Sequence, residues 1–157
     1  MPGHWLFKSE PNEYSIDDLA KEPKKTGRWD GIRNYQARNF LRDKVKENDL
    51  VFFYHSSCKQ PGIVGIAKIV SAPYPDPGQF LPHSPYFDNK ATEENPRWYS
   101  VDLKHIKTFA RTITPDELRK LNALENMYLF KQARLSVQPV SAEEWQHIMQ
   151  LAEPGAS

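Results

Sequence analysis

The chain has 157 residues, enough for one domain with a sizeable core, and its 39% hydrophobic and 26% charged residues are typical of a folded globular protein. No apolar run reaches the roughly 20 residues that cross a bilayer, and residues 1–5 lack the pattern of a secretory signal. The single cysteine, Cys58, cannot form an internal disulfide, so we expect a cytoplasmic protein, or a nuclear one in a eukaryote.

The net charge is only +1, but residues 24–46 carry eight basic side chains against two acidic ones. A local basic patch on a nearly neutral protein fits limited contact with phosphates. It fits an ordinary solvated surface equally well, so charge alone does not decide between the two interpretations.

The first predicted strand covers residues 4–8 and ends at Lys8, Ser9 and Glu10, which bring a cation, a hydroxyl and a carboxylate to the edge of a sheet. Glu10 can accept from an exocyclic amine, and Ser9 can contact a base edge. Polar strand ends also occur for solvation alone. A capping box of Ser15 and Asp18 predicts a short helix over 16–22.

Trp29, Asp30 and Asn34 stand in a polar turn before the second predicted helix, residues 35–44. An exposed indole is costly, so Trp29 either packs into the core or stacks on a ligand. The polar and aromatic residues beside it favour the ligand.

Helix 35–44 has two different faces. Ala37, Phe40 and Leu41 form an apolar face, and the opposite face presents a ring, two guanidiniums and an amide without an acid among them. These are Tyr35, Arg38, Asn39 and Arg42. Such groups suit contacts with phosphates and bases.

Two further strands are predicted at 50–56 and 62–70, joined by a turn-like loop. The earlier of them ends in Tyr54, His55 and Ser56. If it lies beside strand 4–8, two polar strand ends converge. The glycines in 62–70 indicate tight curvature or close backbone approach.

Residues 73–97, here called the flap, contain six of the chain's thirteen prolines and four aromatic side chains. Loops of this length without secondary structure are uncommon in compact domains and are often functional. We interpret the flap as a semi-rigid cover over one side of the domain; a packed loop without a ligand is the alternative.

The remaining predicted elements are a strand over 98–106, helices over 115–122 and 142–152, and a helical turn within 124–132. Residues 153–157 are expected to form a frayed tail. Short strands with helices inserted between them predict a single α+β domain, built as a barrel-like sheet with flanking helices. The mouth of a small barrel can hold one ligand.

Signs of catalysis are weak. The five histidines and Cys58 lack zinc-type spacing, and no glycine-rich phosphate loop or cofactor signature is present. Cys58 lies three residues after His55, but it stands in a turn-like loop, which argues against a nucleophile and base pair. We therefore expect no enzyme, no metal and no cofactor.

Three motifs resemble the EVE domain family: Trp5–Pro11 (WLFKSEP), Trp29–Asn39 (WDGIRNYQARN) and Phe52–Ser56 (FFYHS). The segments Tyr74–Pro77 and Pro96–Trp98 are also similar, and the resemblance covers about residues 4–150. The short N-terminal segment, without a basic extension, is similar to that of bacterial members.

The resemblance implies a PUA-like fold, a small barrel of about five to six strands with flanking helices. It relates the chain to YTH, ASCH and PUA domains, which bind RNA or modified bases. By similarity to the YTH arrangement, Lys8 and Ser9 contact a base edge, Trp29 is a cage tryptophan, and Asn34 lies near the polar pocket residue. The ring opposite Trp29 is Tyr35, Tyr54, Phe80 or Trp98.

The expected function is binding of DNA or RNA by a monomer that takes an extruded, modified base, such as 5-methyl- or 5-hydroxymethylcytosine, into an aromatic pocket. The expected pocket residues are Lys8, Ser9, Glu10, Trp29, Asp30, Asn34, Tyr35, Tyr54, His55, Ser56 and Trp98, and the expected phosphate contacts are Arg33, Arg38 and Arg42. The alternatives are an RNA-binding module of the ASCH or PUA type, a small hydrolase that uses His55 and Glu10, and a protein-interaction module that docks a partner on the flap.

Overall fold

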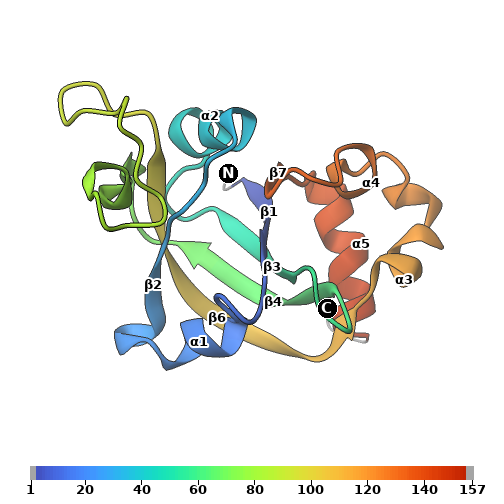
Figure 1. Ribbon diagram of the computed structural model, residues 1–157. Coiled ribbons are helices and arrows are strands. Elements are labelled where there is room, and N and C mark those ends of the chain that lie inside the picture. The colour runs from blue at the N-terminus through green and yellow to red at the C-terminus, as the bar shows by residue number, and fades with distance from the viewer. Residues whose placement is uncertain (1–2, 155–157) are drawn as a thin grey trace.

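The computed structural model describes residues 3–154 and is built around a seven-stranded mixed sheet (Figure 1). The strands are β1 (His4–Ser9), β2 (Thr26–Trp29), β3 (Leu50–His55), β4 (Gly62–Ile69), β5 (Tyr74–Pro75), β6 (Tyr99–Ile113) and β7 (Val137–Pro139). The helices are α1 (Ile16–Lys21), α2 (Tyr35–Asp43), α3 (Pro115–Arg119), α4 (Tyr128–Lys131) and α5 (Ala142–Ala152). Three short 3₁₀ segments cover Pro23–Lys25, Pro77–Phe80 and Asn122–Leu124.

The strand order is β2-β6-β4-β3-β1-β7, with β5 added beside β6. Only the β1–β3 pair is parallel among these ladders. The α+β class is confirmed, but the predicted small β-barrel of about five to six strands is not, because the sheet has seven strands and is not closed into a barrel. Closure needs a ladder between the first and last strands. No ladder joins β2 to β7 in the described part of the chain, so the sheet stays open.

The predicted meeting of two polar strand ends is confirmed. In the parallel ladder Lys8 lies opposite Tyr54, and Ser9 lies opposite His55. Both strands therefore end at the same edge of the sheet, where their polar residues begin.

Two hydrophobic clusters cover the two faces of the sheet. Phe7 and Phe53 belong to one cluster, together with residues of α1 and α2, while their neighbours Leu6 and Phe52 belong to the other, with residues of α3 and α5. Successive strand residues point to opposite faces. Because both faces are buried, the central strands are almost continuously apolar.

The capping signals place the helix starts correctly. Capping boxes open α1 at Ser15 and α5 at Ser141, Thr114 caps α3, and the Asn34 side chain accepts from the backbone N–H of Ala37 at the start of α2. The helix ends differ: α3 stops at Arg119, three residues earlier than predicted, and the segment 124–132 contains only the single turn of α4.

Glycine in β4 permits the close backbone approach that the sequence indicated. A Cβ at Gly65 would lie 2.2 Å from the carbonyl oxygen of Lys107 on β6. Register shifts in both ladders of β4 accompany this approach. Such irregularities increase the local twist and curve the sheet.

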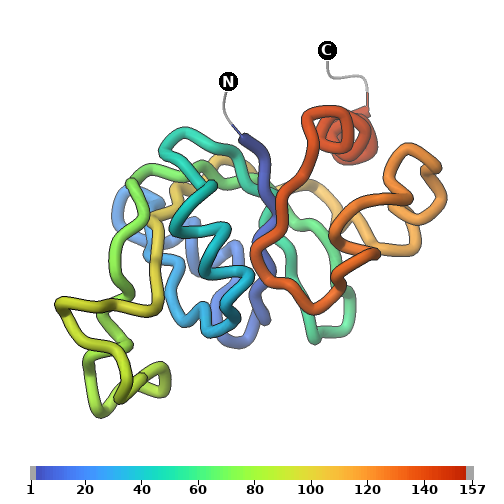
Figure 2. Tube along the Cα trace, turned by 90° about the horizontal axis from the view of Figure 1, so that it is seen from above, coloured from blue at the N-terminus to red at the C-terminus, as the bar shows by residue number. Residues whose placement is uncertain are grey.

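The flap is ordered and carries some secondary structure of its own. Its strand β5 pairs with β6, and the buried Gln79 donates to the carbonyl oxygens of Asp76 and Trp98 and accepts from the N–H groups of Arg97 and Trp98. Figures 1 and 2 show the flap at one end of the molecule, opposite the end that carries α3, α4 and α5.

The chain beyond α5 is described only to residue 154. Glu153 caps α5 and forms an ion pair with Lys107, while residues 155–157 of the predicted frayed tail lie outside the described residues. None of the helices within residues 3–154 combines the length and apolar character needed to traverse a bilayer.

Candidate nucleic-acid interface

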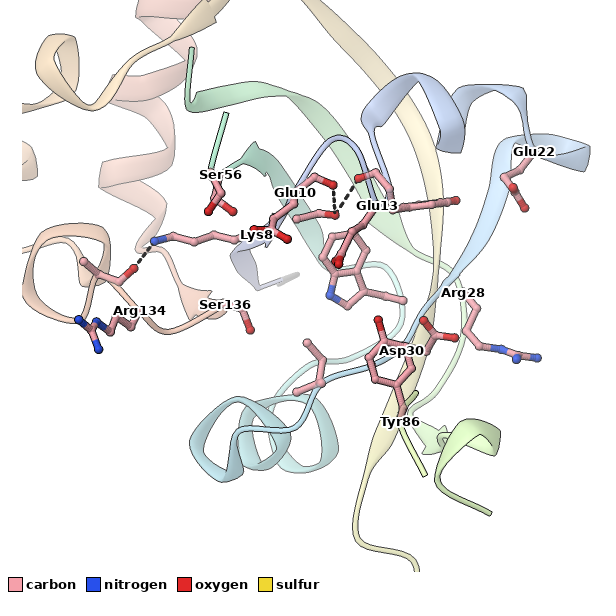
Figure 3. A pocket seen from close by; sticks show the side chains of 17 residues that line it. Lys8, Glu10, Glu13, Glu22, Arg28, Asp30, Ser56, Tyr86, Arg134 and Ser136 are labelled. Carbon is pink, nitrogen blue, oxygen red and sulfur yellow. Dashed lines mark hydrogen bonds between the residues drawn. The ribbon is translucent and has the colours of Figure 1, made fainter. Parts of the chain in front are cut away.

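A cavity of about 770 Å³ opens where β1, β2 and β3 end (Figure 3). Ligand-binding pockets span roughly 300–1,000 Å³, so this volume suits a small ligand or a single nucleotide. The lining residues are Lys8, Ser9, Glu10, Glu13, Tyr14, Glu22, Arg28, Trp29, Asp30, Gly31, Ile32, Ser56, Ser57, Tyr86, Ala133, Arg134 and Ser136.

Trp29 belongs both to the core and to the cavity wall. It is the last residue of β2, and only 6% of it is exposed. Its ring centroid lies 5.4 Å from those of Phe7 and Phe53 and 6.4 Å from that of Tyr14. The buried Nε1 has no hydrogen-bond partner among the described residues. Trp29 therefore forms the floor of the cavity rather than a free stacking surface, because its contacts hold it in the core.

The turn after Trp29 is fixed by the buried carboxylate of Asp76. This carboxylate accepts from the backbone N–H of Gly31 and from the Arg33 guanidinium, both at 2.9 Å, and from the N–H of Gly78 at 2.8 Å. Arg33 in turn donates to the carbonyl oxygen of Tyr86. These contacts, here called the Asp76 anchor (Gly31, Arg33, Asp76 and Tyr86), fasten the flap to the cavity wall.

Gly31 allows Tyr86 to lie directly against the chain. Its φ of 77° is unfavourable for other residues, and a Cβ there would lie 2.7 Å from the Tyr86 ring. The Tyr86 ring is therefore an aromatic wall of the cavity, although Tyr86 is not among the predicted pocket residues. The only feature of the sequence that points to Tyr86 is its place among the aromatic residues of the flap. Nothing in the local pattern distinguishes Tyr86 from Phe80 or Phe87.

The β1 end of the cavity is held by contacts to two other segments. The Ser9 hydroxyl donates to the carbonyl oxygen of Tyr14 at 2.7 Å. The Lys8 ammonium donates to the carbonyl oxygen of Ala133 and lies 5.2 Å from the ring centroid of Tyr54. Burial lowers the pKa of Lys8. The loop before β7 thus forms part of the wall, although no local pattern in residues 132–136 predicts this.

Carboxylates are the commonest ionisable groups of the wall. Burial, and secondarily the neighbouring Asp76, raises the pKa of Asp30. Burial also raises the pKa of the Tyr14 hydroxyl to about 12, with Glu22 contributing. The cavity therefore favours neutral or amine-bearing groups over anions along most of its wall.

Six of the predicted pocket residues line the cavity together: Lys8, Ser9, Glu10, Trp29, Asp30 and Ser56. The structure places the other five elsewhere. The Asn34 amide oxygen is used as the helix cap, and the His55 Nε2 accepts from the N–H of Ile16 at 3.1 Å. Tyr54 is buried in the cluster beneath α5.

Tyr35 and Trp98 stack on each other outside the cavity, with centroids 4.9 Å apart. Trp98 borders a separate hollow of about 310 Å³, and its Nε1 donates to Asp88. Neither ring therefore lies opposite Trp29, and Tyr54 and Phe80 do not line the cavity either.

The arginines predicted to contact phosphates have intramolecular partners. Arg33 belongs to the Asp76 anchor, Arg38 donates to the carbonyl oxygen of Arg97 at 2.8 Å, and Arg42 pairs with Asp43 at 2.7 Å. The sequence could not reveal these partners, because Asp76 and Arg97 lie 43 and 59 residues away along the chain. Arg42 remains exposed, whereas Arg33 helps to build the site.

Metal-binding clusters do not form in the described part of the chain, where no three His, Cys, Asp or Glu residues are placed to hold an ion.

A family model for the EVE domain matches residues 3–151. The chain belongs to the EVE domain family. Among curated relatives, thymocyte nuclear protein 1 of Rattus norvegicus is 45% identical, and that of Homo sapiens is 43% identical; each alignment covers 98% of this chain and 75% of the relative.

Two solved structures superimpose closely on the chain, and a third shares its fold. A crystal structure of human THYN1 in complex with 5-methylcytosine-containing DNA has a TM-score of 0.92 at 43% identity and covers 98% of this chain and 99% of that one. A protein of Pseudomonas putida has a TM-score of 0.90 at 49% identity, with coverage of 96% and 99%. A Zymomonas mobilis ASCH protein, at 14% identity and a TM-score of 0.59, shares the fold alone.

Proposed function

We propose that this EVE domain binds DNA by taking one extruded, modified base into the cavity between Trp29 and Tyr86, and that it is a reader rather than an enzyme. The supporting observation is the cavity itself, a single-nucleotide-sized space lined by aromatic and hydroxyl groups at the strand ends. The structural relative bound to 5-methylcytosine-containing DNA supports the choice of ligand. The fold likeness to an ASCH protein supports a place in the PUA-like superfamily.

The energetics of this binding mode are favourable only with close contacts. Extruding a base costs a few kcal/mol, and stacking on an aromatic ring returns about 1–3 kcal/mol. One added methyl group contributes only about 1 kcal/mol by burial. Selectivity for a modified base therefore requires a well-fitted wall, which the Asp76 anchor provides by fixing Tyr86.

Tyr86→Ala tests the proposal better than a change at Trp29, because Trp29 is part of the core. Loss of the Tyr86 ring should weaken binding to an oligonucleotide with one 5-methylcytosine by roughly 10-fold or more, the size expected of one base–ring contact. Fluorescence anisotropy with the purified chain measures this.

Phe87→Ala is the matched control, because Phe87 is the next flap residue and does not line the cavity. It should change affinity less than twofold. Wild-type protein that binds modified and unmodified oligonucleotides equally well would contradict the proposed selectivity.

His55 and Cys58 give little support to the hydrolase alternative. The Nε2 of His55 already accepts a hydrogen bond, and Cys58 does not line the cavity. Mass spectrometry of the oligonucleotide after incubation with equimolar protein should show an unchanged mass.

The choice between DNA and RNA as the partner is a separate question. Fluorescence anisotropy with an RNA oligonucleotide of the same sequence decides it.

A further inference from the structure

The charges of the cavity wall are separated in space. Lys8 and Arg134 lie at one end, and Glu22, Arg28 and Asp30 lie at the other, with Glu10 and Glu13 between them (Figure 3). Four carboxylates face three cations around the whole wall. The two ends therefore differ in the chemical groups they can accept.

The cationic end suits a phosphate. Arg134 is exposed and has no hydrogen-bond or ion-pair partner in the described part of the chain, and Lys8 lies beside it with its ammonium on the Ala133 carbonyl. Arg33 and Arg38 also donate to intramolecular partners, but unlike Lys8 and Arg134 they do not line the cavity. The cations available to a strand entering this cavity thus come from β1 and from the loop before β7.

At the other end Glu22 and Asp30 outnumber the single cation, Arg28, whose Nε donates to the Tyr74 hydroxyl. This end, here called the carboxylate end, suits a base that carries an amine. Asp30 follows the aromatic floor directly, and the Asp76 anchor holds the next residue, Gly31, against Tyr86. A carboxylate in this position accepts from an exocyclic amine, as acidic side chains accept from cytosine N4. It repels the carbonyl oxygen that thymine and uracil present at the same place.

We propose that this charge separation orients the bound nucleotide, with its phosphate at Lys8 and Arg134 and the exocyclic amine of its base at Asp30, so that the cavity selects cytosine-type bases over uracil-type bases. This inference rests on the proposed function and adds to it the orientation of the ligand and two residues that determine it. Arg134 is a new phosphate contact, and Asp30, rather than Glu10, is the amine acceptor.

The test compares two oligonucleotides that differ in one group. 5-Methylcytosine and thymine both carry the 5-methyl group, and they differ at C4, where one has an amine and the other a carbonyl. Each is placed once in the same sequence, opposite an abasic site, so that neither is paired. Wild-type protein should bind the 5-methylcytosine form roughly 10-fold more tightly, within the range expected for one base-edge contact.

Asp30→Asn should reduce the ratio of the two affinities to about one, because the amide can donate to the thymine carbonyl as well as accept from an amine. Asp116→Asn, at an exposed aspartate on α3 outside the cavity, is the matched control and should leave the ratio unchanged. An unchanged ratio in Asp30→Asn would overturn the assignment of the amine, and loss of the ratio in Glu10→Gln instead would assign it to Glu10.

Arg134→Ala should weaken binding of both oligonucleotides by the same factor and reduce the slope of log affinity against log salt concentration by about 1. Arg119→Ala, at an exposed arginine outside the cavity, should leave the slope as in wild type. A slope unchanged by Arg134→Ala would contradict the phosphate contact.

The outcomes separate this inference from the proposed function. Wild-type protein that prefers 5-methylcytosine to cytosine, yet binds 5-methylcytosine and thymine equally, would retain the reader function and overturn the amine contact. Wild-type protein that binds none of the oligonucleotides would overturn both.

Discussion

At the residue scale, the cavity wall combines the polar end of β1 with the Tyr86 ring, which lies against Gly31. Lys8, Ser9 and Glu10 could be selected because the polar end of a strand is visible in the pattern, and they do line the cavity. Asn34 was selected as a pocket residue, but in the structure its amide oxygen accepts from the N–H of Ala37 and caps α2, a role that was not predicted. Tyr86 was missed because its position depends on Gly31, 55 residues earlier in the sequence.

Asp30→Asn should stabilise the protein at neutral pH. Partial desolvation by the surrounding protein, and secondarily Asp76, raises the folded-state pKa of Asp30, although its side chain is exposed. The ionised carboxylate therefore opposes folding by a small amount, and stability falls as pH rises from the ordinary aspartate pKa of about 3.9 through the raised value. Thermal melting should show a higher Tm for the variant at pH 7, and the difference should vanish toward about pH 3, where both forms are neutral.

Asp18→Asn is a control for which the change in Tm at pH 7 should have the opposite sign. The backbone N–H of Ser15 in the capping box lowers the pKa of Asp18, so its stabilising effect is present at neutral pH and is lost as pH falls through the lowered value. This variant should therefore melt at a lower temperature than wild type at pH 7. A Tm of Asp30→Asn below that of wild type at pH 7 would contradict the assignment to Asp30.

At the element scale, pairing with a strand distant in sequence determines the existence of β2 and the length of β6, which the local residue pattern did not predict. Residues 26–29 contain a glycine and an arginine and give no strand signal, yet they form β2 because β6 offers them a ladder from Lys104 to Val101. The alternating pattern that predicts a strand at 98–106 fades beyond Leu103, but β6 continues to Ile113 because β4 pairs with it there. Caps and the alternation of apolar residues were sufficient where an element is stabilised locally.

Asp76→Ala should detach the flap from the cavity wall. The Asp76 side chain is fully buried, and its loss leaves the Arg33 guanidinium and the Gly31 N–H without their partner. Removing one member of a buried ion pair costs about 3 kcal/mol or more. Hydrogen exchange of residues 73–97 should accelerate, and the denaturant midpoint should fall.

Asp43→Ala is the matched control, because Asp43 also pairs with an arginine, but on the surface. Exposed ion pairs contribute about 0–1 kcal/mol. Equal effects of the two substitutions would show that the Asp76 anchor is no stronger than a surface pair and that other contacts hold the flap in place.

At the scale of the whole molecule, the sequence predicted the α+β fold class but not whether the sheet closes into a barrel. The alternation of apolar strands and capped helices gave the α+β class, whereas an open or closed sheet depends on whether β2 and β7 meet, and no local signal encodes this. The same limit applies to the cavity. Its wall combines strand ends, the flap and the loop before β7, and only the folded sheet brings these together.

Ligand binding should stabilise the entire fold, because the cavity connects segments from both ends of the sheet. A ligand at 100 times its Kd adds about 2.7 kcal/mol, which for a domain of this size raises Tm by about 5–10 °C. Differential scanning fluorimetry with the 5-methylcytosine oligonucleotide should show this rise, and the unmodified oligonucleotide should give a smaller one. A rise that persists undiminished in Tyr86→Ala would place the ligand outside the cavity.

The place of β1 in the sheet, next to the edge strand β7, has a consequence for protein synthesis. This strand lies between β3 and β7, so it acquires its second neighbour only after residues 137–139 have been made. Lys8 and Arg134, which flank one mouth of the cavity, are separated by almost the whole translation of the domain. A chain that stops before residue 134 lacks part of the cavity wall, so the binding proposed for this cavity should appear only after translation has passed the loop before β7.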